Sequence, residues 1–489
     1  MLFNSLTYLV FLAIAWPLVV LGGPRVRNAT ILFGSLTFYG FWRLDFLVVL
    51  LLSAWIDFFA GGRIAASASN RVRKAWLVLS IAMNLLLLGF FKYTYFIADS
   101  ATGLCQLLGL EVTLDLRRAI DIILPLGISF YTFQSMSYTI DIYRRVLEPV
   151  ARFRLFLSYV ILWPQLVAGP ILRTSEVVPQ LVRYTRPTRG EFSFGLEEIL
   201  VGLFKKLFLA DTIAPIVDAG FAVPASELGT LDVWTLAFAF GFQIYYDFSG
   251  YSQIALGSAR ILGFQFPRNF NWPYLATSPR DFWRRWHISL SSWIRDYLYL
   301  PLQGVAFRPR TAGDSHAGSP TEHASELRRS VSLLLTWGIM GLWHGASWTF
   351  VAWGIWHAML VLAHRMTEPL RVRLPMALRT VGGWSVTLAL SMLGWIYFRA
   401  QSLDSANAMI LRAFDFRSLR TMSLRENDYL ITFGYMCGFL VMALAWKLNE
   451  RGLVPKWLRV ACVFAAQAVM ITAVFLLLRQ AKSFIYFNF

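Results

Sequence analysis

A histidine stands near the middle of the longest uncharged stretch of the sequence. His344 lies in WGIMGLWHGASWTFVAW, and no Asp, Glu, Lys or Arg occurs between Arg329 and Arg365. A neutral imidazole can take a proton from a hydroxyl group near neutral pH. An ionisable residue at membrane depth is costly and therefore a candidate functional residue by default. The alternative is a structural histidine hydrogen-bonded to a neighbouring helix, and the residues around His344 leave both interpretations open.

A second histidine lies in SPRDFWRRWHISLSSWIRDYLYLPL. Helical spacing groups two sets of side chains on opposite faces, an apolar set with Trp283, His287, Leu290 and Ile294 and a polar set with Arg284, Ser291 and Arg295. We therefore expect an amphipathic helix at a membrane interface, capped by Ser278 or Asp281. His287 would face the apolar side, and Arg284 and Arg285 would face phosphates or lipid head groups. Taken alone, the segment is explained as well by an interfacial helix with snorkelling arginines.

The remaining candidates for chemistry are weaker. His357 is a possible support for His344, and Asp247 in QIYYDFSGYSQIA is more typical of a structural bridge between helices at a helix break near Gly250. His316 and His323 lie in a polar loop, where solvated histidines are the expected interpretation. The sequence has no G-x-S-x-G, H-E-x-x-H, P-loop or Rossmann fingerprint. We expect no metal site.

Composition places these residues in a membrane protein. The chain has 489 residues, of which 57% are hydrophobic and 15% charged, whereas soluble domains carry about 25% charged residues. The net charge of +17 is distributed between apolar segments, which indicates positive-inside loops and contact with anionic lipids rather than nucleic acid. The cysteines are 3 in number and widely spaced, which argues against a disulfide framework.

Apolar runs long enough to cross a bilayer recur along the chain, and we expect roughly eleven to thirteen spans of about 20 residues each. Run 29–61 is too long for one span and holds Arg43 and Asp45, so it should form two short helices. Run 330–364 would make a helix of about 50 Å, so it must tilt or break at one of its glycines. Polar loops are expected at about 304–329 and 399–427, inside a single integral membrane domain covering 1–489.

Basic loops predict the orientation. Clusters of arginine and lysine occur at 63–74 and at 144–154, while the loop between these spans, 98–118, carries Asp99, Glu111 and Asp115 as well as Arg117 and Arg118. The positive-inside rule places both clusters in the cytoplasm and 98–118 outside. If run 29–61 crosses the membrane twice, Arg25 and Arg27 lie inside and the N-terminus lies outside.

Several ordered segments together resemble the membrane-bound O-acyltransferase (MBOAT) family, in its bacterial branch that acetylates glycans such as alginate. They are LPLGISFYTFQSMSYTIDIYR (124–144), PQLVAGPILR (164–173), GLFKKLFLADTIAPIVD (202–218), QIYYDFSGYSQIALG (243–257), DFWRRWHISLSSWIRDYLYLPL (281–302), GLWHGASWTFVAWGIWH (341–357), MLGWIYFRA (392–400) and FIYFNF (484–489). They extend over nearly the whole chain in family order. After LPL, relatives commonly continue with Gly-Gly, whereas Gln303 and Gly304 follow here, and Asn488 stands where Gln is common.

The resemblance implies an all-α polytopic fold with re-entrant or interfacial segments and a central tunnel. It implies that His344 is catalytic together with His287, and that Tyr486 is a candidate acyl relay. Candidates for binding the donor or substrate are Arg284, Arg285, Trp343 and Asp281. The donor would be acyl-CoA, most simply acetyl-CoA, with no permanently bound cofactor. The acyl group would cross the bacterial inner membrane to a periplasmic SGNH-like acyltransferase that acetylates a polysaccharide.

Two other classes of protein fit parts of the sequence. A transporter or flippase for a lipid-linked saccharide also has many spans and broken helices, but it predicts inverted repeats, which the sequence does not show. A scaffold of a polysaccharide export complex leaves a buried His344 without a role.

Overall fold

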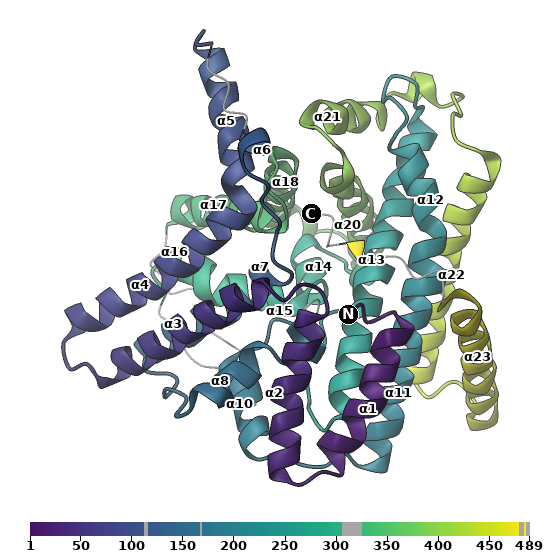
Figure 1. Ribbon diagram of the computed structural model, residues 1–489. Coiled ribbons are helices and arrows are strands. Elements are labelled where there is room, and N and C mark those ends of the chain that lie inside the picture. Colours follow the sequence, from purple (N-terminus) through teal and green to yellow (C-terminus); the bar gives the residue numbers. More distant parts are fainter. Residues whose placement is uncertain (112–115, 167–168, 306–324, 479–483, 486–489) are drawn as a thin grey trace.

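The computed structural model describes residues 1–111, 116–166, 169–305, 325–478 and 484–485. Within these ranges the chain forms helices and no strands, as the sequence predicts (Figure 1). Both histidines of interest, His344 and His287, lie in the described part, whereas Tyr486, His316 and His323 lie outside it.

Five helical segments are long and apolar enough to cross a membrane. They are α3 (Phe46–Ala66), α4 (Asn70–Leu88) continued through η1 (Gly89–Tyr93) into α5 (Thr94–Leu107), α20 (Met376–Arg399), α22 (Glu426–Glu450) and α23 (Lys456–Leu477). α1 (Leu6–Val20) is a shorter apolar helix. One of these, α23, has no buried residue although it is strongly apolar. An apolar helix exposed on the outside of the bundle is the arrangement that a bilayer stabilises.

Both long apolar runs divide, the first as the sequence predicts and the second by a break, which the sequence left as an alternative to a steep tilt. The first gives α2 (Pro24–Gly40) and α3, and Arg43 and Asp45 form an ion pair of 2.6 Å in the turn between them. The second gives α17 (Glu326–His344) and α18 (Trp348–Met366). The two halves then pack closely: a Cβ on Gly354 would lie 2.1 Å from the carbonyl oxygen of Trp337. Glycine therefore allows backbone contact at this crossing.

A long helix, α13 (Thr230–Ile261), lies in the middle of the helical bundle and is buried over most of its length (Figure 1). α11 (Arg189–Phe204), η2 (Lys205–Ala210), α12 (Asp211–Gly220), α20 and α22 pack around it. The helix continues unbroken through Asp247 and Gly250, so the helix break expected there is wrong. Gly250 instead permits close packing, because its Cβ would lie 2.7 Å from the carbonyl oxygen of Gly202 on α11.

Short helices complete the fold. On the amino-terminal side they are α6 (Leu116–Ala119), α7 (Ile128–Tyr143), α8 (Phe153–Val160), α9 (Trp163–Leu166) and α10 (Thr174–Val182). The centre and carboxyl-terminal side hold η3 (Pro273–Leu275), α14 (Pro279–Arg285), α15 (Ile288–Ile294), η4 (Arg295–Tyr299), α16 (Leu300–Leu302), α19 (Glu368–Arg371), α21 (Leu403–Arg412) and η5 (Phe416–Ser418).

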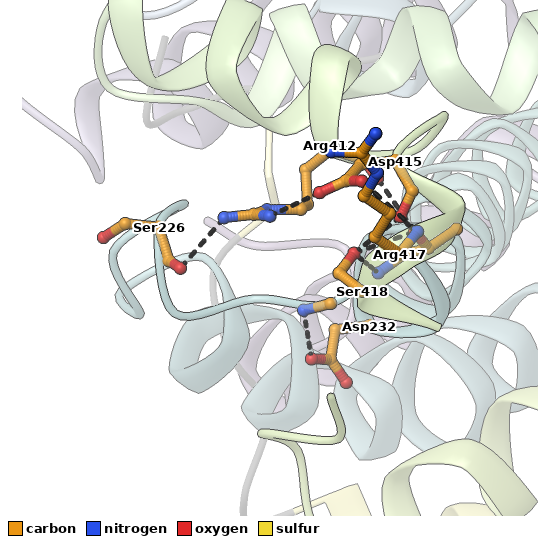
Figure 2. Close-up of polar contacts among 8 residues, drawn as sticks. Ser226, Asp232, Arg412, Asp415, Arg417 and Ser418 are labelled. Carbon is orange, nitrogen blue, oxygen red and sulfur yellow. Dashed lines mark hydrogen bonds and ion pairs between the residues drawn. The ribbon is translucent and has the colours of Figure 1, made fainter. Parts of the chain in front are cut away.

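The polar stretch at 399–427 folds onto the amino end of α13. Figure 2 shows Arg412 between the carboxylate of Asp415, at 2.7 Å, and the carbonyl oxygen of Ser226, at 3.1 Å. Asp232 accepts a hydrogen bond from the backbone N–H of Gly229 at 2.7 Å, which caps the helix. This stretch is therefore an ordered cover for one end of the central helix.

Candidate active site

His344 is the last residue of α17. The helix stops there because Gly345 adopts an extended conformation, with φ −157° and ψ 145°, and Ser347 starts the next helix by accepting a hydrogen bond from the N–H of Thr349. His344 thus lies at a break inside an apolar segment, where the helix ends and His344 and Gly345 are both buried. The side chain is 4% exposed.

His287 lies at a second break, which corrects the expected continuous amphipathic helix. α14 ends at Arg285, α15 begins at Ile288, and His287 between them has a left-handed backbone with φ 42°. The break is held from outside the segment, since the N–H of Ile288 donates to the carbonyl oxygen of Asn269 at 2.9 Å. Ser278 caps α14 as predicted, accepting from the N–H of Asp281 at 3.1 Å.

The two histidine rings are brought together. Their centroids lie 6.4 Å apart, and His287 is fully buried. Aromatic rings surround both histidines. The ring centroid of Phe248 lies 4.6 Å from that of His287, and the ring centroid of Trp353 lies 5.0 Å from that of His344. Neither ring nitrogen of His287 has a hydrogen-bond partner among the residues that the structure describes. Because buried polar atoms in proteins are normally hydrogen-bonded, these nitrogens are suited to meet a polar group of a ligand.

A cavity of about 510 Å³ reaches His344. Its walls come from the start of α1, the turn between α2 and α3, the segment before α7 and the end of α17. The lining includes Ser5, Trp42, Lys92, Leu126, Phe130 and Trp343. Trp343 also stacks on Phe133, with ring centroids 5.2 Å apart, which fixes one wall of the cavity beside His344.

One charged residue at this site was missed by the sequence reasoning. Lys92 lies in η1, in the middle of a membrane-spanning segment, and lines the same cavity as His344. Its ammonium group donates to the carbonyl oxygens of Trp343 at 2.6 Å and His344 at 3.1 Å. A single lysine inside the apolar run 75–97 was the signal that could have identified it.

Comparison with known proteins identifies the family. The family model described as MBOAT, membrane-bound O-acyltransferase, matches residues 152–313. The chain is 37% identical to a probable alginate O-acetylase of Pseudomonas aeruginosa, over 91% of this chain and 80% of that protein. It is 32% identical to a peptidoglycan O-acetyltransferase of Helicobacter pylori, over 78% of this chain and 73% of the relative. The chain belongs to the membrane-bound O-acyltransferase family. A teichoic acid D-alanyltransferase of Streptococcus thermophilus is 30% identical over 48% of this chain and 55% of that protein.

Membership of the MBOAT family makes the chain a multi-pass membrane enzyme of the acyltransferase class. The expectations of fold class and enzyme class are thereby confirmed. The roles of individual residues in this MBOAT protein stay predictions, which the geometry around the two histidines can now sharpen.

The residues predicted to bind the donor are only partly brought together. Trp343 lines the cavity, whereas Arg284, Arg285 and Asp281 lie on α14 and are absent from its lining. Arg285 and Asp281 form an ion pair of 2.9 Å, so each has a structural partner. Arg284 is exposed, and its side chain makes no hydrogen bond or ion pair with the described residues.

The described part of the carboxyl-terminal segment comes close to His287. Phe484 is buried, and its ring centroid is 5.5 Å from Phe248, the residue that contacts His287. The N–H of Ile485 donates to the carboxylate of Asp247 at 2.9 Å. Tyr486 itself lies outside the described residues. The predicted role of Tyr486 as acyl relay therefore rests on the family resemblance alone.

Two further points concern the remaining polar residues. Asp247 bridges helices as predicted, because its carboxylate pairs with Lys206 of η2 at 2.5 Å. His357 is buried beside Trp283, with ring centroids 5.0 Å apart, and its ring also lies 5.2 Å from that of Trp353, which separately contacts His344. Within the described ranges, no group of His, Cys, Asp and Glu side chains could hold a metal ion.

Proposed function

We propose that the protein transfers an acetyl group from cytoplasmic acetyl-CoA across the bacterial inner membrane to a periplasmic partner. That partner, an SGNH-like acyltransferase, would then acetylate an exported or cell-wall polysaccharide. The observation that carries the proposal is the pair of buried histidine rings, 6.4 Å apart, of which His344 lines a cavity of about 510 Å³. The relatives' names, alginate O-acetylase and peptidoglycan O-acetyltransferase, support acetyl as the group and a glycan as the final acceptor.

The proposed chemistry uses His344 as general base. Its neutral ring takes the proton from the acceptor hydroxyl, whose oxygen forms a bond to the carbonyl carbon of the thioester. The carbon–sulfur bond then breaks, and the thiolate leaves as CoA after receiving the proton from His344. His287 donates an N–H to the carbonyl oxygen while negative charge develops there; loss of one such donor reduces kcat about a hundredfold or more.

The two ends of the site favour transfer from one side to the other. The cavity is lined by Met1 and Leu2, by Trp42 and by the segment 124–130. The positive-inside rule places all of these residues on the outer side of the membrane. Arg284 lies on α14, off this cavity. We therefore assign acceptor entry to the cavity and donor entry to the opposite side of the membrane, with Arg284 as a candidate contact for the donor.

The acceptor that first receives the acetyl group is a hydroxyl reached through the cavity. Candidates are a hydroxyl of the periplasmic partner and the phenol of Tyr486 as an intermediate relay. A glycan hydroxyl would receive the group last, since a polymer is too large to enter a space of about 510 Å³.

The test is a reconstituted transfer reaction. Purified protein in sealed proteoliposomes receives external acetyl-CoA labelled in the acetyl group. The rate is expressed per molecule of protein whose basic loops face the outside of the vesicle. We expect CoA release that depends on an acceptor supplied in the lumen, such as a serine-containing peptide or an oligosaccharide with the partner enzyme. Consumption of acetyl-CoA that is unaffected by the acceptor, or no consumption with any acceptor, would overturn the proposal.

A further inference from the structure

The carboxyl end of α17 is held by side chains from another membrane-spanning segment. Lys92 donates to the carbonyl oxygens of Trp343 and His344, at 2.6 and 3.1 Å. The neighbouring Tyr93 hydroxyl donates to the carbonyl oxygen of Leu342 at 2.8 Å. Both side chains come from η1, a π-helical turn between α4 and α5. Such single turns inside longer helices occur frequently at functional sites.

This arrangement answers a local physical need. The last carbonyl groups of a helix have no partner within the helix, and they carry the negative end of its dipole. At α17 the chain becomes extended at Gly345, and Trp343, His344 and Gly345 are buried, which limits the access of water to these carbonyl groups. An ammonium group placed against them supplies both hydrogen bonds and opposite charge. Lys92 therefore fixes the backbone of the residue that carries the catalytic imidazole.

The charge of Lys92 exceeds what helix capping requires. No carboxylate forms an ion pair with Lys92 in the part of the chain that the structure describes. An ammonium has three N–H donors, and the contacts with Trp343 and His344 use two of them. Lys92 also lines the cavity that reaches His344. A cation retained at membrane depth without an anionic partner indicates that an anion or a developing negative charge meets it during function.

We propose that Lys92 is the cation of the transfer site. Two of its N–H groups hold the end of α17 and so orient His344, and the third binds the carbonyl oxygen of the acyl group as negative charge develops on it. The inference rests on the proposed acyl transfer and adds a residue to it. It assigns Lys92 a role in both positioning and stabilisation, whereas a purely structural lysine would act on folding alone.

Three side chains at position 92 separate these roles. Lys92→Met removes the hydrogen bonds and the charge, whereas Lys92→Gln keeps a donor for the helix end but no charge. Lys92→Cys, made in a protein whose Cys105, Cys437 and Cys462 are changed to serine, can be alkylated with 2-bromoethylamine. Alkylation of the thiol releases bromide and produces an ammonium at nearly the length of lysine. Lys74→Met is the matched control, because Lys74 lies on the same segment and is exposed.

The expected result is a fall in kcat of about a hundredfold for Lys92→Met and Lys92→Gln, the usual effect of losing one stabilising donor. KM for acetyl-CoA should stay within about threefold, and aminoethylation of the Lys92→Cys variant should restore at least about a tenth of the activity of the cysteine-free parent. Lys74→Met should behave as wild type. Lys92→Gln should remain monodisperse in detergent, so that it reports on charge even where Lys92→Met fails to fold.

Three results would overturn the inference: a kcat within about threefold of wild type for Lys92→Gln, an effect confined to KM, or a failure of aminoethylation to raise the activity of folded Lys92→Cys protein. His344→Ala is measured in the same preparations. If His344→Ala also keeps its activity, the proposed transfer mechanism fails. If His344→Ala is inactive and the Lys92 variants are fully active, only the role of Lys92 fails.

Discussion

A buried ion cluster beside the carboxyl-terminal segment gives a quantitative prediction. Lys206 and Asp247 are each 2% exposed and pair at 2.5 Å, and Lys206 also pairs with Asp211 at 2.7 Å. Removing one partner of a buried pair leaves an uncompensated charge and costs about 3–5 kcal/mol. Lys206→Met removes the cation from both carboxylates and should have this full effect. Asp247→Asn leaves Lys206 with Asp211, so its cost should be about 1.5–3 kcal/mol, the value of a charged hydrogen bond.

The double variant Lys206→Met/Asp247→Asn distinguishes coupling from simple addition. It removes the buried Asp247 charge that the single Lys206→Met variant leaves behind, so it should be more stable than that single variant. The assay is thermal unfolding of the detergent-solubilised protein, followed by tryptophan fluorescence. We expect the midpoint of Lys206→Met to fall by about 3–5 °C, because the entropy of unfolding of a chain of 489 residues is about 1 kcal/mol/K. The matched control is Asp218→Asn, which breaks the exposed Arg399–Asp218 pair and should cost about 0–1 kcal/mol.

The same cluster should affect activity, because Asp247 accepts the N–H of Ile485 and so holds the segment that packs near His287. Asp247→Asn should lower kcat more than Asp218→Asn does. Equal thermal midpoints for Lys206→Met and the control, or a double variant whose loss equals the sum of the two singles, would refute this account of the cluster.

Three further predictions concern the helices around the site. Gly354→Ala places a methyl group 2.1 Å from the carbonyl oxygen of Trp337 and should destabilise the protein by about 1–3 kcal/mol. The control Gly434→Ala, whose added methyl group has nothing within 4 Å, should not lower the thermal midpoint. An equal fall of the thermal midpoint in the two variants would contradict the packing argument. Arg284→Gln should raise KM for acetyl-CoA several-fold with little change in kcat, and a pure kcat effect in steady-state kinetics would exclude donor binding. His287→Ala should lower kcat about a hundredfold, with His287→Gln retaining more activity than alanine; equal rates for both variants would argue against an N–H donor at this position.

The sequence was sufficient for the features that depend on local composition. The break in run 330–364 follows from length and glycine content, and the structure places it at Gly345, directly after His344. The turn that holds Arg43 and Asp45 follows from charge inside an apolar run. In both places the physical reason lies within a few residues of the feature itself, which is why a single sequence reveals it.

Features that depend on distant residues were not predicted. The periodicity around His287 is helical on both sides, but the hydrogen bond from the N–H of Ile288 to Asn269 breaks the helix between them. The role of Lys92 depends on contact with carbonyl groups more than two hundred residues away in sequence. Asp247 was correctly expected to bridge helices, but its helix is unbroken because Gly250 serves close packing instead of a turn.

The most direct test of the central claim is the transfer rate of His344→Ala. The variant is purified alongside wild type, shown to be inserted and monodisperse, and given labelled acetyl-CoA with an acceptor under single-turnover conditions. Loss of a general base lowers the rate about 10²–10⁴-fold, so we predict that transfer falls into this range while acetyl-CoA binding is retained. Transfer at a rate close to that of wild type would contradict the assignment of His344 as the base.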